Sequence, residues 1–354
     1  MRQLDRYVGG QALKFFVLSA AVLTSLFSLL EFVDQLRSVG HGNYGVADAL
    51  VYVALTVPFR LLQLAPVSML LATLLALGTL GRHSELLILK SVGVSEAQIV
   101  APVLKLAVPL VAALFVLAQF VIPPAQMMAQ ARRSSALYAS ESINKGNVFW
   151  AHRGGQYLSV QRFEYSNILK DVDIYEFSPG GSLQDILHAD EADIRPGGTW
   201  LLSGVQKRSF DGAAFHLERL ATMTWSTSIP TDLLVLPPES MPPLALYQYV
   251  RDLHGRHQQA LRYEQELWVK ASIPLTLVGM ILLAAPFVFG LPRSQNSGRL
   301  LAVGAVGGVV FTLGQQIAWH LALLLDLNPM AGALAPSVAL MALAVALFGR
   351  VHRP

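Results

Sequence analysis

The chain has no cysteine among its 354 residues, and only 14% of them are charged. The absence of cysteine excludes disulfides, thiolate catalysis and cysteine-ligated metals. A soluble protein carries roughly 25% charged residues, so the shortage of charge indicates that lipid surrounds much of the chain. The net charge of +3 is small, and the basic residues gather beside apolar segments, which makes nucleic acid a poor candidate partner.

What the chain has in abundance is long apolar sequence, and six runs can each cross a bilayer, which takes roughly 20 helical residues. The runs cover 11–36, 46–80, 101–122, 271–291, 301–325 and 332–349. No small-residue cleavage site follows the first run, so we expect a retained helix and not a signal peptide. Pro58 and Pro66 predict a kink or break in the second run, because each removes a backbone donor.

The basic residues predict how the helices are oriented, since cytoplasmic loops carry the excess of Lys and Arg. With the N-terminus inside, the cytoplasmic ends hold Arg2, Arg6, Arg82, Lys90, Arg293, Arg299, Arg350 and Arg353. The short outer loops near 37–45 and 326–331 contribute only Arg37. We therefore expect both termini in the cytoplasm and residues 123–270 on the far side of the membrane.

Between the third and fourth runs the periodicity changes to short alternating stretches separated by turn residues, from about Asn147 to Trp225. This pattern is typical of an antiparallel sandwich or jelly roll. The predicted fold class is thus an α-helical membrane protein with six transmembrane helices and an inserted all-β jelly-roll domain. The predicted divisions are 1–139 for helices one to three, 140–235 for the jelly roll, and 236–354 for a connecting helix and helices four to six.

The search for catalytic motifs gives no phosphate loop, no His-Glu-x-x-His zinc motif and no Gly-x-Ser-x-Gly nucleophile. His254 and His257 share one helix face, where a solvated surface is far more common than a metal site. We expect no catalytic residues, no metal and no resident cofactor. Any energy that the protein uses must then come from a partner.

The loop between helices two and three, residues 83–93, predicts a short helix that ends at Gly93 as a C-terminal cap. The segment is too apolar to lie bare in water. It either lies in the lipid interface or fits an apolar groove on a cytoplasmic partner, and the pattern favours neither. The third run then opens with a capping box, Ser95 followed three residues later by Gln98.

Several polar or small residues lie within the apolar runs or at their borders. Ionisable side chains there are costly unless they face a cavity or a partner, and a guanidinium can hold phosphate, although anchoring at the interface is the commoner role. Gly304 and Gly308 permit close helix approach. The candidates are Glu31, Asp34, Arg37, Arg60, Arg132 and Arg133, with Gln315, Gln316 and His320 further along the fifth helix.

Short segments in a matching order resemble the YjgP/YjgQ family of lipopolysaccharide export permeases, which comprises LptF and LptG. The segments are Leu4 to Val8, Phe32 to Leu36, Ser84 to Leu86, Val121 to Pro123, Trp268 to Lys270 and Pro286 to Arg293. The likeness covers nearly the whole chain. The segment Phe32-Val33-Asp34-Gln35-Leu36 favours the LptG branch over the LptF branch.

The resemblance implies an inner-membrane transporter subunit that draws lipopolysaccharide from the outer leaflet and passes it to a periplasmic bridge. Its implied partners are an LptF-type permease, an LptB ATPase dimer that uses ATP and Mg, LptC, and the bridge protein LptA. The β domain is then periplasmic. In this reading residues 83–93 form the coupling helix to the ATPase, and its contacts are Glu85, Leu86, Leu87, Leu89 and Gly93.

The resemblance also implies lateral gates toward the partner permease and basic residues that meet lipid phosphates. The gate residues are Phe32, Gly304, Gly308 and Gln316, and the lipopolysaccharide-binding residues are Asp34, Arg37, Arg60 and Arg133. The chain departs from the family at Glu31, where a lysine is common, and at Phe59, where a basic residue is usual. The site is either rebuilt from Arg37, Arg60 and Arg133, which we favour, or adapted to a differently charged lipid A.

Three other assignments are weighed beside the LptG-type permease. The first is an LptF-type subunit of the same transporter. The second is a mechanotransmission permease without a lipid path of its own, which usually has four helices and not six. The third is an intramembrane enzyme, for which Glu31 and Asp34 are the only nearby acidic pair.

Overall fold

A computed structural model describes most of the chain. The described residues are 2–137, 142–145, 148–153, 156–163, 168–178, 183–195, 199–211, 214–226, 238–255, 260–289, 297–325 and 327–351. The chain forms two compact units: Met1–Leu29, Val57–Val121 and Val250–Pro354 make unit 1, and Leu30–Thr56 and Ile122–Tyr249 make unit 2. The predicted domain limits after 139 and 235 remain predictions.

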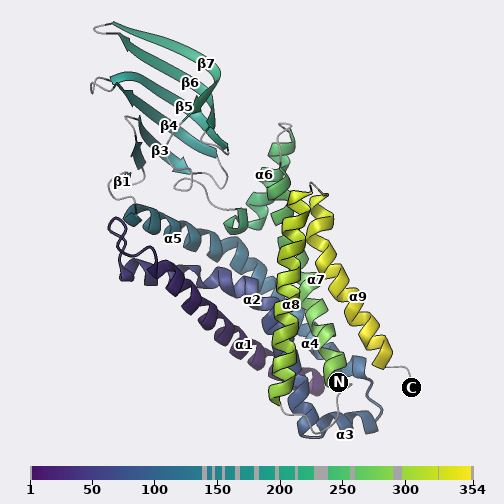
Figure 1. Cartoon of the computed structure of the whole chain (residues 1–354). Coiled ribbons are helices and arrows are strands. Elements are labelled where there is room, and N and C mark those ends of the chain that lie inside the picture. Colours follow the sequence, from purple (N-terminus) through teal and green to yellow (C-terminus); the bar gives the residue numbers. More distant parts are fainter. Residues whose placement is uncertain are drawn as a thin grey trace. The chain divides into compact units, whose positions relative to one another are not determined.

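Helices account for most of the described residues (Figure 1). They are α1 (Arg2–Leu36), α2 (Val46–Arg82), α3 (Glu85–Ser91), α4 (Glu96–Val116), α5 (Ile122–Leu137), α6 (Pro243–Gly255), α7 (Leu261–Phe289), α8 (Ser297–Leu324) and α9 (Pro329–Val351), with a π-helical turn η1 (Leu117–Val121) and a 3-10 turn η3 (Pro238–Ser240). Six spans among them are long and apolar enough to cross a membrane, which confirms the six predicted helices.

The proline residues act differently in the second and third spans. The helix α2 continues through Pro58 and Pro66, so the predicted break does not occur. In the third span, Pro123 and Pro124 have no N–H to donate to the carbonyls four residues earlier, and the wider π turn η1 lies just there, between α4 and α5. The helix therefore goes on past the prolines through Arg133, as the sequence predicts.

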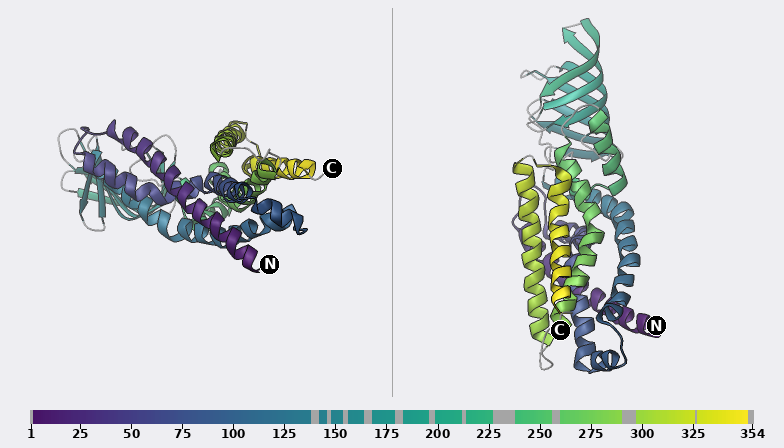
Figure 2. Two further views of the ribbon diagram at one scale, coloured as in Figure 1. Left: turned by 90° about the horizontal axis from the view of Figure 1, so that it is seen from below. Right: turned by 90° about the vertical axis from the view of Figure 1, so that its right-hand side faces the viewer.

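The helices of unit 1 pack around an aliphatic core. Figures 1 and 2 show α7, α8 and α9 running side by side, and of these three helices α7 and α9 have the most extensive contact among the described residues. Gly279 of α7 allows this, because a side chain there would collide with Leu340 of α9. A buried hydrogen bond of 2.8 Å between the hydroxyls of Thr276 and Ser337 also joins the two helices.

The inserted domain in unit 2 is a seven-stranded antiparallel sheet, which confirms an inserted all-β domain. The strands are β1 (Ser142–Lys145), β2 (Val148–Arg153), β3 (Gln156–Phe163), β4 (Ile168–Phe177), β5 (Leu183–Arg195), β6 (Thr199–Asp211) and β7 (Ala214–Ser226). Each strand pairs with the next along the chain, in the order β1 to β7. This is a meander, whereas a jelly roll is built from Greek keys, so the described strands do not show the topology of the predicted jelly roll.

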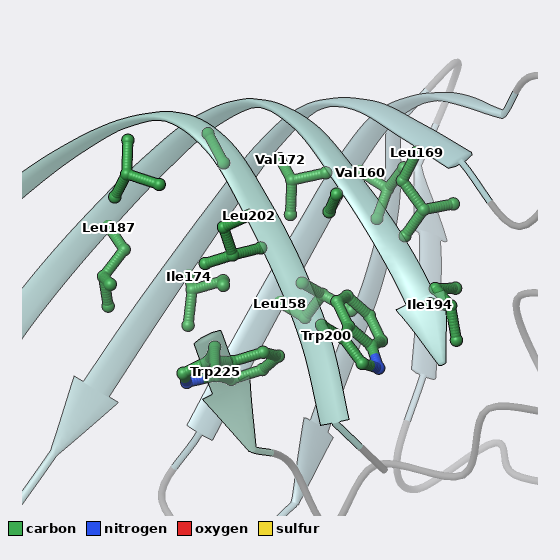
Figure 3. Close-up of a cluster of buried hydrophobic side chains, with 13 residues drawn as sticks. Leu158, Val160, Leu169, Val172, Ile174, Leu187, Ile194, Trp200, Leu202 and Trp225 are labelled. Carbon is green, nitrogen blue, oxygen red and sulfur yellow. The ribbon is translucent and has the colours of Figure 1, made fainter. Parts of the chain in front are cut away.

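One face of the sheet carries the core of the domain (Figure 3). Leu158, Val172 and Leu187 come from three neighbouring strands, and each is at most 1% exposed. Trp200 and Trp225 are cross-strand partners whose rings meet edge to face, with centroids 5.2 Å apart. Such a pair stabilises beyond its buried area by about 0.5–1.5 kcal/mol. The alternation of apolar residues in the sequence thus corresponds to one buried face.

Two residues with left-handed backbone lie across the sheet from the same aspartate. Asp171 on β4 has φ of 55° and Gly204 on β6 has φ of 65°. The register places both opposite Asp190 of β5. A β-carbon at position 204 would collide with the Asp190 side chain, so the site needs glycine for both its backbone angle and its space.

Candidate functional site

The predicted coupling segment forms α3, a helix of seven residues with a well-formed end. Gly93 has φ of 87°, its N–H donates to the carbonyl of Lys90, and the N–H of Val94 donates to the carbonyl of Leu89. This pair of bonds is a Schellman motif, and it confirms the predicted cap at Gly93. The capping box of Ser95 and Gln98 that opens α4 is also present.

The apolar side chains of α3 point in different directions. Leu86 is buried at 8% exposure, lies against Gly81 and so belongs to the interior of the chain. Leu87 and Ile88 are exposed, at 48% and 60%, and Leu89 is half-buried. Of the three leucines predicted to contact the ATPase, only Leu87 is thus exposed. Ile88, which was not among the predicted contacts, is exposed beside it.

Glu85 is connected to two membrane helices by a series of hydrogen bonds. The Tyr7 hydroxyl of α1 donates to Glu85 Oε1 at 3.2 Å, and Gln11 Nε2 donates to the Tyr7 oxygen at 3.3 Å. The Thr79 hydroxyl of α2 then donates to Gln11 Oε1 at 3.1 Å. We call Glu85, Tyr7, Gln11 and Thr79 the α3 tether. Because Glu85 keeps a second carboxylate oxygen, the tether leaves it able to accept another bond.

The other end of α3 is attached to α4 and α7. Lys90 Nζ lies 2.6 Å from Glu96 Oε1 and 4.9 Å from the centroid of the Phe289 ring. A cation over an aromatic face adds an attraction of about 0.5–1 kcal/mol at an exposed site. The helix α3 is therefore connected at both ends to membrane helices of unit 1. A displacement of α3 has a direct route to α1, α2, α4 and α7.

Arg60 is the buried cation of α2, with 8% exposure in a span where charge is costly. One of its interactions is a hydrogen bond of 3.1 Å from Nη1 to the Ser28 hydroxyl of α1. Ser28 and Arg60 both belong to unit 1. A guanidinium carries five donors, so this contact uses only part of its capacity to bind oxygen ligands.

The other predicted lipopolysaccharide contacts belong to unit 2. Arg37 is exposed and lies 3.8 Å from Asp34, one turn away on the same chain segment. Arg133 of α5 lies with its guanidinium carbon 5.7 Å from the ring centroid of Tyr52, and its buried Nε has no hydrogen-bond partner among the described residues. Arg37 is thus held loosely, whereas Arg133 is partly enclosed.

Glu31, the departure from the family pattern, has a structural partner in the same unit. Gln35 Nε2 donates to Glu31 Oε1 at 2.9 Å, and the Tyr44 hydroxyl donates to Gln35 Oε1 at 3.2 Å. Burial raises the pKa of Tyr44, Arg133 opposes this, and Glu31 adds to it. Glu31 and Arg133 therefore act with opposite sign on the same buried phenol.

The predicted gate residues divide between the units. Phe32 is half-buried in unit 2, and Gln316 is exposed on α8 in unit 1. A side chain at Gly304 would collide with Leu74 of α2, and one at Gly308 would meet Val67. Within the chain these two glycines thus let α8 approach α2 closely, and their role in a gate remains a prediction.

Two further polar groups find local partners. His254 Nε2 lies 2.6 Å from Glu264, while His257 lies outside the described residues. His320 Nδ1 lies 2.8 Å from the carbonyl of Gln316 on its own helix. The described part of the chain contains no group of three or more His, Cys, Asp or Glu that could hold a metal ion.

These features define a class, a multi-pass membrane protein with six spans and an inserted sheet, whose loop helix is connected to the membrane helices. Residues 6–350 match the family described as lipopolysaccharide export system permease LptF/LptG. The chain belongs to this family.

Two curated relatives extend the comparison. The chain is 31% identical to the lipopolysaccharide export system permease protein LptG of Escherichia coli K12, over 98% of both chains. It is also 31% identical to LptG of Haemophilus influenzae, over 95% of both chains. Both relatives carry the LptG name, which supports the LptG assignment and not the LptF alternative.

Proposed function

We propose that this chain is the LptG-type permease subunit of an ABC transporter that extracts lipopolysaccharide from the outer leaflet of the bacterial inner membrane. The extracted lipid passes to a periplasmic bridge. The observation that carries this proposal is the similarity to LptG proteins over 98% of the chain. The six spans and the inserted sheet agree with it. On this proposal the termini are cytoplasmic and the sheet is periplasmic.

The helix α3 is the point where a partner ATPase acts on this chain. Its exposed Leu87 and Ile88 offer an apolar surface to a groove, and Glu85 supplies the polar contact beside them. ATP and Mg belong to that partner, an LptB-type dimer. The α3 tether and the Lys90 contacts support this role, because they connect α3 to four membrane helices.

Arg37, Arg60 and Arg133 contact the phosphates of lipid A, with Asp34 beside them. Arg60 supports this role because a buried guanidinium in a membrane span marks a pathway or a partner site. Arg133 supports it because its Nε lacks a hydrogen-bond partner among the described residues. A phosphate oxygen would supply that partner.

An LptF-type permease, LptC and the bridge protein LptA complete the assembly. The large exposed apolar area of α1 and α8 supports a second permease beside this chain: Val17, Leu26, Val306 and Ile317 are all more than half exposed. Phe32, Gly304, Gly308 and Gln316 then lie on or near the gates between the two permeases.

Co-expression with the neighbouring permease and ATPase genes tests the assignment. We expect one complex that contains a paralogous permease and an ATPase dimer, and that releases lipopolysaccharide from proteoliposomes when ATP is added. Glu85→Ala should reduce both ATPase stimulation and lipid release. Glu218→Ala, at an exposed position on β7, serves as the control. Recovery of this chain as a lone monomer, with the ATPase activity of the reconstituted mixture unaffected by Glu85→Ala, would contradict the proposal.

A further inference from the structure

An apolar cavity of about 620 Å³ lies within unit 1, between α8 and α9. Leu70 of α2 and Leu283 of α7 form its floor, Val303 and Ala318 mark its extent along α8, and Leu343 lines it from α9. All four helices are membrane spans. The cavity therefore lies where the surrounding solvent is hydrocarbon.

The glycines of α8 explain why the space is there. Gly304 and Gly308 bring one side of α8 close to α2, as described above. Gly307 and Gly314 also line the cavity, roughly 60° and 80° further round the helix than Gly304, and a β-carbon at either would meet nothing within 4 Å. The helix thus lies against α2 at Gly304 and Gly308 and leaves an open channel beside that contact, toward α9.

The dimensions of the channel decide what it can hold. Val303 and Ala318 are 15 residues apart, which is about 22 Å along a helix. A helix with side chains is about 10–12 Å wide, so about 22 Å of it takes up roughly 2,000 Å³, about three times the cavity volume, and does not fit inside. A hydrocarbon chain does, since its carbons pack about 4 Å from their neighbours.

The lining chemistry indicates the source of that chain. Gln315 is the one polar side chain that lines the channel among the described residues, and no charged group lines it. Arg37, Arg60 and Arg133, the candidate phosphate ligands, are not part of the lining. The lining therefore has no charged group that could bind a phosphorylated sugar, and its apolar side chains suit an acyl chain.

We propose that an acyl chain of an ordinary bilayer phospholipid occupies this channel and completes the packing of α8 against α9. Gly304, one of the predicted gate residues, lines the channel, but the proposal does not depend on the proposed transport function. The acyl chain then packs against the part of α8 that faces α9, whereas protein side chains of α2 pack against Gly304 and Gly308.

Photocrosslinking tests the proposal. The whole complex is reconstituted in vesicles of phosphatidylethanolamine and phosphatidylglycerol, a fraction of which carries a diazirine on the acyl chain, and labelled peptides are mapped by mass spectrometry. We expect labelling at Phe311 and Leu343 of the lining. The double variant Gly307→Leu with Gly314→Leu fills the channel and should lower that labelling about tenfold, because a filled interior leaves no room for a second chain.

The matched control places leucines at the same spacing on the exposed side of α8, as Ala302→Leu with Val309→Leu. This variant should leave labelling at Phe311 and Leu343 unchanged. The single variants Gly307→Leu and Gly314→Leu should each lower it partly, and they keep the test usable if the double variant does not fold. Labelling of Phe311 and Leu343 that neither the double variant nor the single variants lower would overturn the proposal. So would labelling by a lipopolysaccharide photoprobe with none by the phospholipid probe.

Discussion

The helices α2 and α8 are both apolar membrane spans, yet the chain buries them to different extents. In the most apolar 18-residue window of α2, 67% of the residues are buried by the chain itself, against 11% in α8. Hydropathy alone does not separate the two. The difference shows that α2 is a central helix of its own subunit, whereas α8 presents most of its surface to lipid or to another chain.

This contrast bears on how the subunit works. A helix that the chain buries along most of its length moves only with its neighbours, while a helix that is exposed along much of its length can change place with fewer contacts broken. The α3 tether reaches Thr79 near the end of α2. Gly304 and Gly308 then join α2 to α8. Motion at α3 thus has a continuous route through packed residues to the exposed helix.

The largest effect on stability is expected at a buried leucine of α2, compared with an exposed leucine of α8. Leu77→Ala on α2, at 0% exposure, should lower the free energy of unfolding by about 2–3 kcal/mol. The loss is mainly one of packing, because an unfolded side chain in lipid is also in hydrocarbon. Leu313→Ala on α8, at 53% exposure, should change it by less than about 0.5 kcal/mol. Denaturant titration in micelles measures both, and equal losses would remove the contrast.

A second variant tests the close contact of α8 with α2. Gly304→Leu forces a side chain against Leu71 and Leu74 and should cost about 1–2 kcal/mol through overpacking. Gly314→Leu enters open space and should be neutral or slightly stabilising, since leucine favours helix more than glycine does. Thermal unfolding of the two variants compares them. Equal stability would show that α8 does not depend on its approach to α2.

The six spans could be predicted because bilayer thickness sets their length, and the Gly93 and Ser95 caps because they are local signals. The orientation of side chains depends on contacts made far along the chain. Leu86 and Leu87 look alike in sequence, yet one is buried and the other exposed.

Contacts between residues far apart in the chain could not be predicted from the sequence either. Tyr7 was noticed only as part of a family segment, and its partner Glu85 is 78 residues away. Of the kink or break expected at the prolines of α2, the break is wrong, because the preference of proline is local while the bundle supports the helix through it, and the kink stays a prediction. The meander order of the strands also needed the structure, since an alternating pattern does not specify which strands pair.

A smaller effect is expected at the loop that leads into α2. Tyr44→Phe removes the hydrogen bond to Gln35 and should lower the free energy of unfolding by about 1 kcal/mol near neutral pH. Burial raises the pKa of Tyr44, so the folded state holds the phenolic proton more tightly than the unfolded state does. This contribution is present below about pH 10 and is lost as the pH rises further. Unfolding at neutral and at strongly alkaline pH checks the sign, and Tyr247→Phe is the control.

The smallest effect concerns α1, another largely exposed span. Lys105 Nζ lies 2.7 Å from Asp5, with 65% of the lysine side chain exposed. An exposed pair of this kind contributes about 0–1 kcal/mol, so Lys105→Met should hardly change stability. A loss well above that range in low-salt micelles would mean that α1 relies on this pair more than its exposure suggests.

The most direct test of the proposed coupling is the amount of lipopolysaccharide released per ATP hydrolysed by the reconstituted complex with Tyr7→Phe. This change keeps the ring and Glu85 but removes the hydroxyl that donates to Glu85 Oε1. Coupling through α3 predicts that the ATPase still binds and hydrolyses ATP, while lipid released per ATP falls several-fold. An unchanged ratio, with Glu85→Ala still lowering it, would show that α3 does not act through the tether.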